Sequence, residues 1–91
     1  MNERDEFYKE IGFRIKLLRL LRGISRDELA SKLGISPDHL TKLENGKRHI
    51  RTESVIECSK ILSTTVDFLV RGTDEFYKIY TESALNKDIS K

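Results

Sequence analysis

The 91-residue sequence has little cysteine or proline, with one residue of each, and it has no long apolar run. A single cysteine excludes an internal disulfide and any metal site built from several cysteines. No run is long enough for a membrane helix, and the N-terminus lacks the apolar stretch of a secretion signal. No segment alternates apolar and polar residues as a half-buried strand does. We therefore expect an all-α protein in a cytoplasmic setting, with no membrane association.

Charge is what the chain has in abundance, since 35% of its residues are Asp, Glu, Lys or Arg. The net charge is only +2, but it is unevenly distributed. Residues 14–51 carry ten basic against four acidic side chains, while residues 1–13 and 52–91 each have a net charge of −2. A concentrated basic segment attracts a phosphate backbone, although a solvated basic face would look similar.

Residues 25–48 form the most informative stretch, because they predict two short helices joined by a tight turn. Ser25 is a good N-cap, and Glu28 three residues later completes a capping box. Gly34 lacks the Cβ that penalises the left-handed conformation, so it can end the first helix. The inward positions of this helix are Leu29, Ala30 and Leu33. Ala30 is small enough for two helices to cross on it.

The second short helix begins at Ser36 as the cap, with Pro37 at its first position, where a missing N–H costs nothing. Asn45-Gly46 ends it as a turn pair. Its inward positions are Leu40 and Leu43, and its outward positions are Asp38, His39, Thr41 and Lys42. The pattern presents one face of this helix away from the core.

This stretch resembles the helix-turn-helix of the phage Cro and repressor family, also called the xenobiotic response element family. The similarity covers roughly residues 11–72 and rests on Arg19, Leu29-Ala30, Gly34 and Glu44-Asn45-Gly46-Lys47. Any compact helical domain would explain the leucines, but not these fixed offsets. The loop Arg48-His49-Ile50-Arg51-Thr52 is more similar to that of restriction–modification controller proteins, because it lacks the proline common in the family. The resemblance implies a compact five-helix, repressor-like bundle.

The same resemblance implies a sequence-specific regulator that binds a palindromic operator in double-stranded DNA as a homodimer. The recognition helix would enter the major groove. Base contacts are expected from Asp38, His39, Thr41 and Lys42. Phosphate contacts are expected from Arg26, Ser36, Asn45, Lys47, Arg48 and Arg51. In the family the residues matching Arg19 and Glu44 form a structural ion pair; the alternative is two unrelated surface charges.

No catalytic or metal-binding arrangement is visible, and no cofactor is implied. His39 and His49 have no nucleophile or metal partner at a meaningful spacing, so each is either a DNA contact or a plain surface residue. Cys58 is interpreted as a small buried hydrophobe. We therefore expect the protein not to be an enzyme.

The remaining helices follow from hydrophobic spacing. The first is expected over about residues 5–22, another from a Thr52 cap to about Leu62, and a short one between Thr65 as cap and Gly72 as stop. The expected inward residues are Phe7, Ile11, Ile15, Leu18, Val55, Cys58, Ser59, Leu62, Val66 and Leu69. Residues 1–72 would form the DNA-binding domain, and residues 73–91 an extra helix and tail.

A second apolar stripe on the first helix needs cover. It consists of Phe13, Leu17, Leu20 and Leu21, where the family is usually polar. The expected helix within residues 73–91 has its own apolar face, made of Phe76, Ile79, Tyr80 and Ala84. The two stripes could pack together within one subunit or across a two-fold axis, and we favour the dimeric arrangement. Alternatively, both surfaces would bind another protein, and the chain would be an interaction module.

Overall fold

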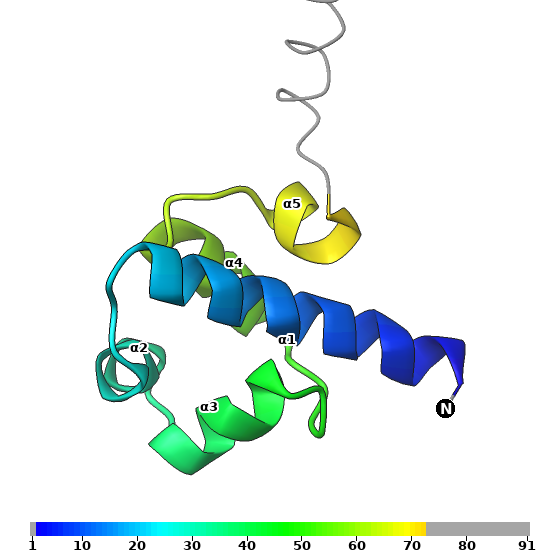
Figure 1. Ribbon diagram of the computed structural model, residues 1–91, viewed down its shortest axis with the longest axis horizontal. Coiled ribbons are helices and arrows are strands. Elements are labelled where there is room, and N and C mark those ends of the chain that lie inside the picture. Colours follow the sequence, from blue (N-terminus) through cyan, green and yellow to red (C-terminus); the bar gives the residue numbers. More distant parts are fainter. Residues whose placement is uncertain (1, 73–91) are drawn as a thin grey trace, which may run out of the picture.

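The computed structural model describes residues 2–72, which form five helices and, over that range, no strand. The helices are α1 (Glu3–Leu21), α2 (Arg26–Leu33), α3 (Pro37–Glu44), α4 (Thr52–Ile61) and α5 (Val66–Arg71). In Figure 1, α1 crosses the domain in front of α4, with α2 and α3 below it and α5 above it. The expected all-α bundle is confirmed. The sixth helix predicted for residues 73–91 lies outside the described residues.

Local capping decides where most helices begin and end. Ser25, Ser36 and Thr65 each accept a hydrogen bond, through the side-chain oxygen, from the backbone N–H three residues later, at 2.9–3.0 Å. Such caps satisfy N–H groups that have no partner within the helix. Gly34 and Gly72 end α2 and α5 in the left-handed conformation, with φ of +71° and +81°. All five residues were predicted in these roles.

Two helix starts differ from expectation. α1 begins at Glu3, two residues earlier than predicted, because the Asn2 side chain caps it by accepting from the Asp5 N–H at 2.8 Å. Thr52 does not cap α4: it is the first helical residue, and Arg51 holds the extended cap position without a side-chain hydrogen bond. The predicted Thr52 cap was wrong because the extended loop ends one residue earlier.

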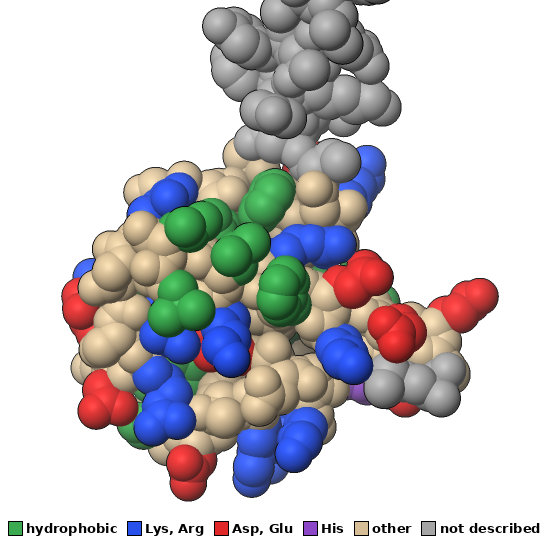
Figure 2. Space-filling view, viewed as in Figure 1, with side chains coloured by type: hydrophobic (Ala, Val, Ile, Leu, Met, Phe, Trp, Pro, Cys, Tyr) green, Lys and Arg blue, Asp and Glu red, His purple; other side chains and the backbone are tan. Residues whose placement is uncertain are grey.

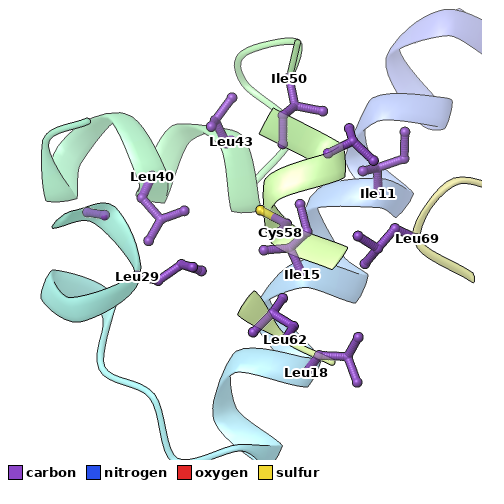
Figure 3. Close-up of a cluster of buried hydrophobic side chains, with 12 residues drawn as sticks. Ile11, Ile15, Leu18, Leu29, Leu40, Leu43, Ile50, Cys58, Leu62 and Leu69 are labelled. Atoms are coloured by element: carbon purple, nitrogen blue, oxygen red, sulfur yellow. The ribbon is translucent and has the colours of Figure 1, made fainter. Parts of the chain in front are cut away.

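The core gathers side chains from all five helices and from the loop before α4. Figure 3 shows these side chains pointing toward one another between α1, α3 and α4. Its members are Ile11, Ile15, Leu18, Leu29, Ala30, Leu40, Leu43, Ile50, Val55, Cys58, Leu62 and Leu69. Burial raises the pKa of the Cys58 thiol to about 12, so this group stays protonated and unreactive, as a buried hydrophobe does.

Two predicted core residues are exposed. Phe7 is 42% exposed and Val66 is 39% exposed. Both line an open hollow of about 240 Å³, which no element of residues 2–72 covers. The N-terminal turns of α1 extend beyond the rest of the bundle in Figure 1. Helical spacing gave the direction of Phe7 correctly, but it could not show that no neighbour reaches that far.

Two arginines, Arg14 of α1 and its C-cap residue Arg22, hold the C-terminal ends of other helices. Arg14 Nη1 donates to the carbonyl oxygens of Leu69 and Val70 at 3.1 and 3.2 Å, and Arg22 Nε donates to the Leu62 oxygen at 3.0 Å. Cations are favourable at helix C-termini, where carbonyl groups lack intrahelical partners. Part of the basic charge of residues 14–51 is therefore structural.

Within residues 2–72, no helix combines the length and apolar character needed to cross a bilayer.

Candidate nucleic-acid interface

α3 is fixed to the bundle through its apolar side and presents the opposite side to solvent. Leu40 and Leu43 are buried against α1 and α2. Ala30 of α2 is fully buried, as expected for the residue on which α2 and α3 cross. The small side chain lets two short helices approach closely enough to share one core. α3 is thereby held as a rigid element on the surface of the domain.

Gly12 allows α1 to lie directly on the last turn of α3. A Cβ atom built on Gly12 would overlap the Leu43 carbonyl oxygen and lie 2.8 Å from the Glu44 carbonyl oxygen. No side chain larger than hydrogen fits there unless the helices separate. Sequence reasoning did not identify Gly12. The signal was a glycine inside a helix, where it costs about 1 kcal/mol relative to alanine and so needs a packing reason.

A buried ion pair fixes the same end of α3. Arg19 Nε donates to Glu44 Oε2 at 2.8 Å, and Arg19 Nη2 donates to Glu44 Oε1 at 3.2 Å. The side chains are only 9% and 4% exposed. Arg19 Nη1 also donates to the Ile24 carbonyl oxygen at 3.1 Å, between α1 and α2. One guanidinium group thus links α1, the turn before α2 and α3, and Arg19 and Glu44 are not unrelated surface charges.

The outward face of α3 combines free charges with one organised polar contact. Asp38 and Lys42 are exposed. The Thr41 hydroxyl donates to the Pro37 carbonyl oxygen at 3.1 Å and accepts from Arg26 Nη1 at 3.0 Å. Thr41 therefore offers mainly its methyl group and one remaining lone pair to a ligand, whereas Lys42 is free to extend. His39 is half-buried.

The residues expected to contact phosphates surround this face. Arg26 and Ser36 lie at the starts of α2 and α3, and the others lie in the segment after α3. All six are exposed: Arg26, Ser36, Asn45, Lys47, Arg48 and Arg51. The backbone N–H groups of Lys47 and Arg48 donate to the Lys42 carbonyl oxygen at 2.9 and 3.3 Å, which folds this loop against the end of α3. Figure 2 shows basic side chains over α3.

His49 anchors the same loop to α1. Its ring stacks on Tyr8, with centroids 4.0 Å apart and planes 13° apart, and its Nε2 atom lies 3.5 Å from Asp5 Oδ1. His49 stays exposed beside these contacts, so both roles left open for it, DNA contact and plain surface residue, remain predictions. Its position supports the neighbouring basic residues of the loop.

A hollow of about 470 Å³ lies between the turn after α2 and this loop. Its polar lining comes from His39, Arg48, His49, Arg51 and Ser54. Four of these five side chains can carry positive charge, so the hollow suits an anionic group such as a phosphate.

Within residues 2–72, no group of three or more His, Cys, Asp or Glu side chains is placed to hold a metal ion.

Comparison with known proteins agrees with this geometry. Residues 15–69 match the helix-turn-helix family HTH_3. The chain is 31% identical over 81 residues to the transcriptional regulator ImmR of Bacillus subtilis, covering 89% of this chain and 63% of ImmR. It is 36% identical over 62 residues to the prophage-derived regulator YonR of the same species, covering 68% of this chain and 57% of YonR. The chain thus spans about three fifths of the length of these relatives.

Solved structures show the same fold. The P22 c2 repressor, in complex with a synthetic operator, is similar with a TM-score of 0.64 and 25% identity, over 69% of this chain and 96% of that one. The restriction–modification controller C.AhdI from Aeromonas hydrophila is similar with a TM-score of 0.67 and 20% identity, over 75% of this chain and 99% of that one. The chain therefore belongs to the helix-turn-helix family HTH_3, the Cro and repressor type of DNA-binding domain found in transcriptional regulators.

Proposed function

We propose that the protein is a sequence-specific transcriptional regulator, without catalytic activity, that acts in the cytoplasm. It binds a palindromic operator as a homodimer. One observation carries the proposal: α3 is fixed at its C-terminal end by Gly12 and the Arg19–Glu44 pair, while Asp38 and Lys42 remain exposed. A rigid helix with free polar side chains is what direct readout of base edges requires.

The roles of individual residues follow from this placement. Lys42 is the long, free donor for guanine O6 and N7, Asp38 accepts from a cytosine amine, and Thr41 contributes its methyl group. His39 contributes at the edge of the face. Positioning contacts to phosphates come from Arg26, Ser36, Asn45, Lys47, Arg48 and Arg51. Two copies of α3 would occupy half-sites about one DNA turn, roughly 34 Å, apart.

Selection of bound duplexes from a random pool tests the proposal with the full chain. We expect one enriched sequence with two-fold symmetric half-sites. Its preference should persist at physiological salt, while log K falls with log salt at a slope of about −0.9 for each phosphate contacted. Enrichment of no sequence, or complete loss of binding at physiological salt, would contradict the proposal. A single enriched half-site would contradict the dimeric mode alone.

A second candidate function is a protein-interaction module. It is favoured by the large apolar side chains that α1 exposes, including Phe13 at 61% and Leu21 at 68%. An adaptor of this kind would show only weak, salt-sensitive affinity for any duplex. The selection experiment therefore separates the two candidates.

A further inference from the structure

An apolar groove runs along α1 on the face seen in Figure 2, where green side chains gather over α1 and beside α5. It comprises two adjoining hollows of about 500 and 250 Å³, which share Lys9, Phe13 and Leu17. We call this surface the α1 groove. Its apolar lining consists of Phe13, Leu17 and Leu20 of α1 and Phe68 of α5. Such a contiguous apolar surface on a small domain marks a binding site.

The ends of the α1 groove lie at functionally distinct elements. The larger hollow reaches Phe68 of α5, and the smaller one reaches Glu44 and Asn45 at the end of α3. Whatever fills the α1 groove therefore contacts both α5 and the C-terminal end of α3, the proposed recognition helix.

The described chain ends at the edge of this groove. A Cβ atom built on Gly72 would lie 2.7 Å from Arg14 Nη2, and Arg14 lines the larger hollow. Nineteen residues, 73–91, follow Gly72 in the sequence. The sequence therefore continues from a point beside the α1 groove. No intervening linker is needed for it to reach the groove.

The sequence after Gly72 has an apolar pattern that suits the α1 groove. Phe76, Ile79 and Tyr80 recur at the spacing of one helical face. Residues 74–84 carry three acidic side chains and one lysine, a net charge of −2. The charged lining of the groove is balanced, with three basic side chains, Lys9, Arg14 and Lys16, and three acidic ones, Glu6, Glu10 and Glu44. The match between the two therefore rests on their apolar faces, and the lining charges do not oppose an acidic segment.

We propose that residues 74–84 of the same chain dock in the α1 groove and complete the domain. Eleven helical residues span about 16 Å, enough for the roughly 10 Å between Phe13 and Leu20 along α1. Attachment at Gly72 makes the contact intramolecular, with an effective concentration in the millimolar range or above that a separate partner does not reach. The exit point at Arg14 favours this arrangement over the exchange between subunits that the sequence suggested.

Disulfide trapping in the full chain tests the proposal. Two double variants pair Leu17→Cys with either Phe76→Cys or Ile79→Cys; Cys58 is retained because it is fully buried. The control pairs Ser31→Cys, exposed on α2, with Ile79→Cys. We expect at least one groove pair to form a disulfide within a single chain at least tenfold faster than the control. A disulfide-linked dimer would show that a second copy fills the groove, and formation no faster than the control in both pairs would show that residues 74–84 do not dock; either result overturns the proposal.

Discussion

Replacing Arg19 with methionine should leave the Glu44 carboxylate buried without its partner. Among the described side chains, Arg19 supplies both hydrogen bonds to this carboxylate, which is only 4% exposed. A buried charge that loses its partner costs about 3–5 kcal/mol. Arg19→Met should therefore lower the free energy of unfolding by about 3–5 kcal/mol.

The reciprocal variant should be destabilised for the same reason. Glu44→Met leaves the Arg19 guanidinium with the Ile24 carbonyl oxygen as its remaining partner, and arginine does not lose its proton in proteins. Its cost should accordingly be of the same order, about 3–5 kcal/mol. The double variant removes both charges, so it should be less destabilised than the sum of the single variants by about 2–3 kcal/mol.

Urea denaturation of the single and double variants measures these free energies of unfolding. The exposed Glu57–Lys60 pair, 3.8 Å apart, is the matched control, and its coupling should stay below about 0.5 kcal/mol. A coupling between Arg19 and Glu44 as small as that of the control would refute the reasoning. So would an Arg19→Met variant that is as stable as the unsubstituted protein.

Three further predictions concern packing. Gly12→Ala should lower stability by about 1–3 kcal/mol in thermal unfolding although alanine favours helices, because its methyl group meets backbone oxygens of α3; a raised Tm would contradict the close contact. Ala30→Leu should cost about 1–3 kcal/mol by overfilling the crossing of α2 and α3, and an unchanged Tm would show that they do not cross there. Cys58 should not react with a thiol reagent at pH 8 until the protein unfolds, because burial raises the pKa of its thiol to about 12; rapid reaction in the native state would argue against its burial.

The features that could be predicted from the sequence depend on neighbours within a few residues. Ser25, Ser36 and Thr65 cap helices through contacts three residues apart, and Gly34 ends one through its own backbone. These signals, with helical spacing, were enough to place the helices and the outward face of α3, whereas the five-helix bundle was inferred from the resemblance to the Cro and repressor family.

The features that were missed depend on contacts between distant segments. Gly12 faces residues 43 and 44, and Arg14 reaches carbonyl groups 55 and 56 residues away. No local pattern encodes which helix end an arginine will meet. Phe7 and Val66 failed for a related reason: spacing gives the side of a helix, but not how far the neighbouring elements extend.

The most direct test of the central claim compares Lys42→Ala with Arg48→Ala on the selected duplex and on its single-base variants. If α3 reads bases, Lys42→Ala should cost about 1–3 kcal/mol on the preferred site and relax preference at one base pair. Arg48→Ala should instead weaken binding to all sequences equally and reduce the salt slope by about 1. Equal weakening of all sequences by Lys42→Ala, with base preference unchanged, would contradict the assignment of α3 as the recognition helix.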